Sequence, residues 1–249
     1  MDFDYPEQAT PFRAKVRAFL EANLPKDWKG IGALNHADAA AWTEEWRKKL
    51  SAEGLLAITW PKEYGGAGLS HIESLVVAEE FARAGVPAGG PNDGFGIGML
   101  GNTIIAVGTE EQKRHFLPRV LSGEDRWCQG YSEPAAGSDL GNLGCRAVLD
   151  GDEWIINGQK IWTSAGHLAN HIFVLARTAP DEVKHRGITF LLVDMRQPGV
   201  EVRPIKMMSG DSEFNEVFFT DARCPKENVV GEVNGGWMVA MTLLGNERG

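Results

Sequence analysis

The first hundred-odd residues of the chain carry apolar side chains at helical spacing. Trp42, Trp46 and Leu50 recur every four residues, which places all three on one face of a helix. The pattern stops at Gly54, and glycine is the residue that most often follows the last turn of a helix. This segment therefore predicts an amphipathic helix with its tryptophan face in a core.

Two further segments of this region begin with the residue pair of a capping box. Ser70 is followed three residues later by Glu73, and Thr109 in the same way by Gln112. In such a pair the first side chain accepts from the helix backbone and the second reaches back to the first residue. Each pair marks a helix start. Together with the preceding helix they predict an α-helical domain over residues 1–126.

Beyond residue 127 the pattern changes to short runs rich in β-branched and aromatic residues. Asp150 and Gly151 stand between two of these runs as a hairpin turn, and no helical segment separates successive runs. Strands joined in this way pair antiparallel, so residues 127–234 are expected to form a β-barrel or sandwich domain. The predicted strands are 146–149, 154–157, 171–176, 188–194 and 217–220.

Helical spacing returns after Gly235, where Trp237, Met241 and Leu244 share one face. The printed sequence stops at Gly249 without a cap, a proline or a polar tail. Residues 235–249 are therefore interpreted as the start of a third, truncated helical domain. The fold class expected for the whole is a multidomain α+β protein.

Composition narrows the class of protein. Hydrophobic residues make up 43% and charged residues 24%, which is typical of folded globular proteins. The net charge of -9 disfavours nucleic acid as a partner, since a phosphate backbone would be repelled. The acidic amino terminus lacks the apolar core of a secretory signal, and no apolar run has the length of a membrane span, so the cytoplasm is the expected compartment.

Cysteine and histidine positions predict no metal site. Cys128, Cys145 and Cys224 are far apart and form none of the short spacings of a zinc site or a disulfide framework, so reduced, structural thiols are expected. His171, like His115 and His185, stands alone in its segment and is expected to be a surface or capping residue.

Two segments carry the candidate chemistry: WCQGYSEPAAGSDL at 127–140 and NGQKIWTSAG at 157–166. The first is a loop of small residues that ends in Gly137 and Ser138. Without bulky side chains, its backbone N–H groups can approach a pyrophosphate. The loop is therefore a candidate site for an anionic cofactor.

Three side chains in these segments suit a polar-edged aromatic ring such as a flavin. Ser132 and Ser164 offer hydroxyl groups, and Trp162 offers a flat apolar face. The same residues also fit a purely structural hairpin with polar turns. Chemistry alone leaves both interpretations open.

The order of motifs decides between them. S-E-P-x-A-G-S-D and N-G-x-K-x-W-T-S follow W-P-K-E-Y-G-G at 60–66 and G-T-E-E-Q-K-x-x-F-L-P at 108–118, and this series resembles the acyl-CoA dehydrogenase family over nearly the whole chain. The resemblance implies a helical domain, a β-domain and a C-terminal four-helix bundle, with FAD between the last two. The bundle is expected to be missing from the printed sequence.

The resemblance also implies site residues. Ser138 is expected to border the CoA part of the substrate as well as the cofactor, and Arg248 to contact substrate. Family members often have threonine where Ser132 and Ser164 stand, which keeps the hydroxyl. The residues expected to bind FAD are Gln129, Tyr131, Ser132, Gly137, Ser138, Trp162, Thr163 and Ser164.

Glu247, in G-N-E-R-G, is the candidate catalytic base. Removal of the α-proton of a thioester needs a carboxylate beside that carbon, in a cleft poor in water. Glu247 matches the position at which a minority of the family, including isovaleryl-CoA enzymes, carry the base, beside the arginine that Arg248 matches. The alternative is that the base lies in the missing bundle and that Glu247 is an ordinary solvated helix residue.

One glycine pattern is rejected as a cofactor motif. Residues 96–101, GIGMLG, satisfy the dinucleotide fingerprint, but the preceding VPAGGPND is not a strand and the region lacks strand–helix–strand alternation. By resemblance these glycines fall on a helix near the acyl pocket, where they allow close packing.

The function expected from the resemblance is α,β-desaturation of an acyl-CoA, with electrons passed to an electron-transfer flavoprotein in a homo- or hetero-tetramer. Alternatives are an acyl-CoA oxidase, a nitroalkane oxidase or a flavin monooxygenase on the same scaffold. Another is a subunit of a hetero-oligomeric steroid-type dehydrogenase of the actinobacterial kind. The acyl group is not readable from the sequence.

Overall fold

The computed structural model describes residues 9–247, except for the side chain of Glu247. The chain divides into two compact units, one ending at Gly90 and the other starting at Pro91. Each unit has its own elements and core, and each is described by itself below.

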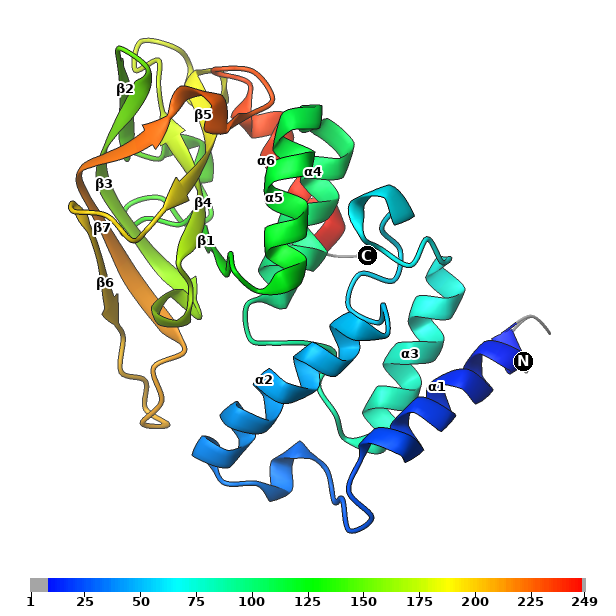
Figure 1. Cartoon of the computed structure of the whole chain (residues 1–249). Coiled ribbons are helices and arrows are strands. Elements are labelled where there is room, and N and C mark those ends of the chain that lie inside the picture. Colours follow the sequence, from blue (N-terminus) through cyan, green and yellow to red (C-terminus); the bar gives the residue numbers. More distant parts are fainter. Residues whose placement is uncertain (1–8, 248–249) are drawn as a thin grey trace. The chain divides into compact units, whose positions relative to one another are not determined.

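The first unit is helical (Figure 1). Helices α1 and α3 pack against each other, and the core contains Leu20, Trp46 and Phe81. Trp42 stacks on Trp46 with ring centroids 5.2 Å apart, so the predicted tryptophan face does lie in a core. The elements are α1 (Ala9–Asn23), η1 (Ile31–Ala33), α2 (His36–Ala52), η2 (Lys62–Tyr64) and α3 (His71–Ala84).

A buried carboxylate joins two helices of this unit. Glu80 of α3 is 4% exposed and accepts hydrogen bonds from Arg17 of α1 at 2.8 and 3.1 Å. Arg13 of α1 and Arg83 of α3 also contact this carboxylate. Hydrogen bonds from Arg17 have the largest effect on the pKa of Glu80, and those from Arg13 add to it. Burial opposes both, and the pKa falls from 4.5 to about 2.

The second unit combines a sheet with helices. The sheet order is β6-β7-β3-β2-β4-β5-β8, with β1 paired to β4. Both predicted capping boxes are confirmed, the second at the start of α5. The helical elements are η3 (Gly94–Gly101, a π-helix), α4 (Asn102–Val107), α5 (Glu110–Ser122), η4 (Leu140–Asn142), η5 (Gly166–Leu168), η6 (Lys184–Gly187), η7 (Lys226–Asn228) and α6 (Gly236–Glu247). The strands are β1 (Trp127–Gly130), β2 (Arg146–Asp150), β3 (Glu153–Ser164), β4 (His171–Arg177), β5 (Ile188–Asp194), β6 (Val200–Pro204), β7 (Phe214–Pro225) and β8 (Val229–Val230).

The sheet is mainly antiparallel, as expected, but β4 has two parallel neighbours, β1 and, through the single pair Arg146–Arg177, β2. β1 runs parallel to β4, in a register that pairs Trp127 with His171. A parallel pair needs a long crossover, which is commonly a helix. Here the chain between β1 and β4 is instead the β2–β3 hairpin, which turns at Asp150 and Gly151 as predicted. A parallel pair can therefore form without an α-helix between its two strands.

Both faces of the central strands are covered. The first six residues of β4 and of β5 are all buried. One face belongs to a core that includes Ile156, Val174 and Phe219. Helix α6 and the π-helix η3 contact strands of this sheet, and Figure 1 shows the green and red helices on one side of it. Continuous apolar runs such as those of β4 and β5 are typical of strands buried on both faces.

Helix α6 buries a different face from the one predicted. Val239, Ala240 and Leu243 are buried, whereas Trp237 is only half-buried and Met241 is 37% exposed. The helix has apolar side chains of its own on most sides, so their spacing does not determine which face is buried. Contact with β5, α4 and η3 selects it instead.

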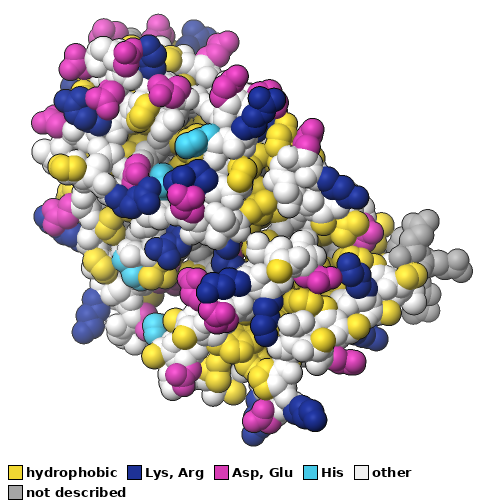
Figure 2. All heavy atoms as spheres, viewed as in Figure 1, with side chains coloured by type: hydrophobic (Ala, Val, Ile, Leu, Met, Phe, Trp, Pro, Cys, Tyr) yellow, Lys and Arg dark blue, Asp and Glu magenta, His cyan; other side chains and the backbone are white. Residues whose placement is uncertain are grey.

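All three cysteines are buried free thiols within the part of the chain that the structure describes. Burial raises the pKa of Cys145 to about 11 and of Cys224 to about 12, and raises that of Cys128 as well, so all three stay protonated. Figure 2 shows acidic and basic side chains interspersed over one face of the molecule. Among residues 9–247, no helix combines the length and apolar composition that crossing a bilayer requires.

Candidate functional site

The two motif segments lie side by side in the second unit. β1 forms the start of the first motif, and the second motif comprises the end of β3 and the two residues after it. The backbone N–H of Ile161 donates to the carbonyl oxygen of Ser132 at 2.9 Å, which joins the motifs by a main-chain hydrogen bond. Ser132 and Ser164 are both half-buried. The structure thus brings together residues that are about thirty positions apart in sequence.

A buried ion pair fixes this arrangement. Lys160 is fully buried, and its Nζ lies 2.7 Å from Oε1 of Glu133 and 3.1 Å from the carbonyl oxygen of Tyr131. The Glu133 carboxylate also accepts from the backbone N–H groups of Gly144 and Cys145, at 2.6 and 2.9 Å. These partners of the carboxylate come from the second motif and from the segment that leads into β2. The pair therefore holds both motifs and the start of β2 in one geometry.

The sequence interpretation missed Glu133 and Lys160 as site residues. Both are letters of the quoted motifs, the Glu of S-E-P and the Lys of N-G-x-K. A glutamate and a lysine are usually exposed, and full burial is the exception that requires pairing. The signal available in the sequence was a lysine in the second motif and acidic residues, Glu133 and Asp139, in the first.

Trp162 lies at a β-bulge. The pairing of β3 with β7 shifts register between Lys160 and Thr163, where β3 contains one residue more than β7. Trp162 has a φ of 60°, in the left-handed region that non-glycine residues rarely adopt. Its side chain is 57% exposed, with Phe214 in edge contact at 6.0 Å between ring centroids. The bulge therefore presents a large flat ring to the outside of the sheet.

Each motif segment contains a buried polar side-chain atom that lacks a partner among the described residues. Gln129 Nε2 and Thr163 Oγ1 are inaccessible and have no hydrogen-bond partner among the residues that the structure describes. Asn215 lies opposite Thr163 in the ladder and donates from Nδ2 to the carbonyl oxygen of Thr163 at 2.9 Å. Buried polar groups are nearly always hydrogen-bonded, so orphaned ones indicate a missing ligand or water. The residues present fit a ring system with a flat face and polar edges.

The glycine-rich end of the first motif is open. Gly137 and Ser138 are exposed, and a Cβ added to Gly137 would meet no atom of the described chain within 4 Å. Asp139, next along the chain, pairs with Lys184 at 3.2 Å. This end therefore has room for a group that approaches the backbone. Tyr131 is buried and makes edge contacts with the rings of two phenylalanines at 5.9 and 6.4 Å, so its side chain faces the core.

The candidate base is only partly described. Glu247 is the last residue of α6, and its side chain lies outside the described residues, as does all of Arg248. The residue before it, Asn246, donates to Thr103 of α4 at 3.3 Å. Helix α6 thus reaches α4 through its final turn.

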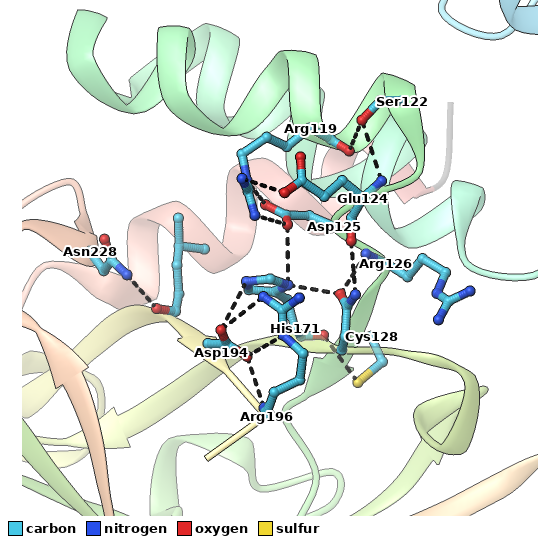
Figure 3. A network of polar contacts seen from close by, with 12 residues as sticks. Arg119, Ser122, Glu124, Asp125, Arg126, Cys128, His171, Asp194, Arg196 and Asn228 are labelled. Carbon is cyan, nitrogen blue, oxygen red and sulfur yellow. Dashed lines mark hydrogen bonds and ion pairs between the residues drawn. The ribbon is translucent and has the colours of Figure 1, made fainter.

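His171 is not a surface residue, contrary to expectation. It is 6% exposed at the start of β4, with Nδ1 2.8 Å from Asn170 Oδ1 and 3.6 Å from Asp125 Oδ1 (Figure 3). Asp125 is held by a bidentate pair with Arg119 at 2.8 and 2.9 Å. Burial lowers the pKa of His171, although Asp125 and Asp194 oppose this effect. The parallel β1–β4 pair, which the sequence did not indicate, is what buries this ring against Trp127.

Two domain models of one protein family together match most of the chain. Residues 6–124 match the family described as acyl-CoA dehydrogenase, N-terminal domain, and residues 128–222 match acyl-CoA dehydrogenase, middle domain. Among curated proteins, the acyl-CoA dehydrogenase IpdE1 of Mycobacterium tuberculosis is 48% identical over 242 residues, which cover 96% of this chain and 62% of that protein. The chain therefore spans less than two thirds of that relative.

Solved structures give the same result. One described as the steroid ACAD Tcur3481-Tcur3483 is 38% identical with a TM-score of 0.82, covering 100% of this chain and 63% of that one. The ChsE4-ChsE5 complex from Mycobacterium tuberculosis is 36% identical with a TM-score of 0.78, covering 99% of this chain and 61% of that one. Two matched domains in the expected order, on the fold described above, identify this chain as a member of the acyl-CoA dehydrogenase family.

Proposed function

We propose that this chain belongs to an FAD-dependent acyl-CoA dehydrogenase that removes two hydrogens from the α and β carbons of a CoA thioester. Electrons leave through an electron-transfer flavoprotein. The proposal rests chiefly on the residues found at the bulge of β3 and in the first motif. The exposed Trp162 ring, at φ 60°, directly precedes Thr163, whose buried Oγ1 is unpaired, and Gln129 Nε2 in the first motif is buried and unpaired as well; a buried ion pair joins the two motifs.

The residues of the two motifs have separate binding roles. The backbone around Gly137 and Ser138 approaches the pyrophosphate of the cofactor, where an added side chain would block contact. Trp162 packs against the ring system, and the hydroxyls of Ser132 and Ser164 hydrogen-bond its polar edge. When bound, FAD supplies the acceptor for the hydride that leaves the β carbon.

Glu247 is proposed as the base that takes the α-proton. Its carboxylate accepts the proton while the pair of electrons from the broken C–H bond forms the new α,β double bond. Loss of the β-hydride to the cofactor completes the oxidation, so two electrons and two hydrogens are accounted for. A cleft that excludes water makes the carboxylate a stronger base by removing its hydration.

We propose that the substrate is a steroid-derived acyl-CoA. We also propose that the enzyme is a hetero-oligomer. The support is the likeness to structures whose titles name a steroid enzyme and paired subunits. Within such an assembly this chain would be the catalytic subunit, because it retains the small-residue flavin loop and a glutamate at the base position.

The test uses the full-length protein. It should purify with an oxidised-flavin spectrum, and a steroid-type acyl-CoA added without oxygen should bleach that spectrum. Reoxidation should be fast with electron-transfer flavoprotein and slow with oxygen. Fast reoxidation by oxygen with release of peroxide would identify an oxidase. Colourless protein that takes up no FAD, alone or with a partner subunit, would contradict the proposal.

A further inference from the structure

Among the described side chains, the final turn of α6 contains no fully buried apolar residue, and Leu244 is half-buried. The buried apolar side chains of this helix, Val239, Ala240 and Leu243, all lie before its last turn. Gly245 follows, and a Cβ added there would meet no atom of the described residues within 4 Å. Glycine inside a helix costs about 1 kcal/mol relative to alanine because its backbone is freer. A polar contact in this turn can therefore contribute to its position.

That contact is a polar link to α4. Asn246 Nδ2 donates to Thr103 Oγ1 at 3.3 Å, and Thr103 Oγ1 donates to the carbonyl oxygen of Met99 at 2.8 Å. A hydroxyl has a single hydrogen, and here Met99 receives it. Thr103 can then only accept from Asn246, so the direction of the whole chain of hydrogen bonds is determined. Thr103 is fully buried, which protects the link from competing water.

Met99 belongs to the π-helix, and its carbonyl lies near the junction with α4. Side chains at this junction bond back by four residues: Asn102 to the carbonyl of Gly98 at 2.8 Å, and Thr103 to that of Met99. A π-helix of eight residues is unusual, and such wide turns are frequent at functional sites. Thr103 differs from Asn102 in that its hydroxyl also receives a bond from α6.

We infer that Thr103 is a positioning residue, which acts through Asn246 to fix the rotation of the last turn of α6, the turn to which Glu247 belongs. The inference rests on the proposed function. Successive residues of a helix are about 100° apart around its axis, so a side chain tied to α4 at Asn246 limits the rotation of the turn that contains the next residue. A misplacement of about 1 Å at a reacting group can slow a reaction by roughly 10²-fold.

The experiment compares threonine variants of the full-length, flavin-loaded protein. Thr103→Val keeps the shape and removes the hydroxyl, whereas Thr103→Ser keeps the hydroxyl. Thr242→Val is the matched control, because the Thr242 hydroxyl bonds back to Met238 within α6, at 3.1 Å. The measurements are flavin content, thermal unfolding, the limiting rate of flavin reduction by acyl-CoA without oxygen, and the dissociation constant of substrate.

We expect Thr103→Val to lower the limiting rate by roughly 10–100-fold at unchanged flavin content and substrate affinity. Thr103→Ser should restore most of the rate, and Thr242→Val should keep it. Asn246→Ala should match Thr103→Val, and the double variant should be no slower than either, since both changes break one link.

Several results would overturn the inference. These are a wild-type rate in Thr103→Val, an equal loss in Thr242→Val, or an additive double variant. A slow Thr103→Val beside a Glu247→Gln variant of normal rate would also overturn it, since the residue would then position something else. Failure of the proposed function is distinct from all of these, because wild-type protein would then show no flavin reduction by acyl-CoA.

Discussion

Lys160 and Glu133 form a buried ion pair, 2.7 Å between Nζ and Oε1, that connects the two sequence motifs of the candidate flavin site. Neither residue needs to touch the cofactor to matter for it. Their positions decide where the loop before β2 and the bulge of β3 lie relative to each other. The clearest predictions concern this pair and the residues that it holds in place.

Removing one partner of the pair should be strongly destabilising. Glu133→Gln leaves a buried ammonium group without its counter-charge, and Lys160→Met leaves a buried carboxylate, so each should cost about 3–5 kcal/mol of unfolding free energy. Denaturant unfolding measures this cost. Asp152→Asn is the control, because the Asp152–Lys226 pair is exposed and screened by solvent and should therefore contribute little. Equal small losses in all three variants would contradict the role given to the pair.

Two substitutions of Trp162 should distinguish its effect on cofactor binding from its effect on backbone strain. Trp162→Gly and Trp162→Ala both remove the ring, so FAD should bind at least about tenfold more weakly to each, a loss of about 1.4 kcal/mol. Only glycine adopts φ 60° without penalty, so the glycine variant of the cofactor-free protein should be more stable than the alanine variant by about 1 kcal/mol. FAD titration and thermal unfolding measure the two effects. Unchanged FAD affinity in both variants would remove Trp162 from the site.

Ser138→Trp should abolish FAD retention while the helical unit stays folded. An indole beside the exposed Gly137 would occupy the space through which a phosphate reaches the backbone. The measurement is the ratio of flavin to protein after purification, with circular dichroism as a check on folding. Ser122→Trp, at an exposed helix residue, is a control that should keep its flavin. A normal flavin ratio in Ser138→Trp would contradict the position assigned to the loop.

Glu247→Gln should bind flavin and substrate but react slowly. The amide keeps the size of the carboxylate and cannot take a proton at neutral pH, so flavin reduction by acyl-CoA should slow by roughly 10²–10⁴-fold. Stopped-flow absorbance at saturating substrate measures this rate. Weaker binding alone would raise the substrate concentration required and leave the saturated rate intact. A wild-type saturated rate would show that the base is another residue.

Glu80 should make the stability of the first unit sensitive to acid. Its pKa falls from 4.5 to about 2 on folding, chiefly through Arg17, so the stabilisation is complete above pH 4.5 and is lost as the pH drops towards 2. Unfolding free energies measured across this range should therefore decline more steeply in wild type than in Glu80→Gln. Glu45→Gln, which alters an exposed pair with Lys48, should keep the wild-type slope. Parallel curves for wild type and Glu80→Gln would contradict this account.

Local features of the chain were predictable because their causes are local. The capping boxes at Ser70 and Thr109 act between residues three apart, and the hairpin at Asp150 depends on two turn residues. The near-continuous apolar runs of β4 and β5 likewise appear as strands in the sequence itself. The motif segments at Gln129 and Trp162 were found in the same way, since each is contiguous.

Relations between distant segments were decided by the tertiary structure. The parallel pairing of β1 with β4 buries His171, which no pattern around that histidine reveals. The bulge that turns Trp162 outwards exists only because β7 pairs with β3 out of register. The sequence by itself determined the family, the helical and β regions and the motifs, because these depend on neighbouring residues. Only the fold decided that Lys160 meets Glu133 and that α6 buries Val239 instead of Trp237, because burial and charge pairing depend on which distant segments come together.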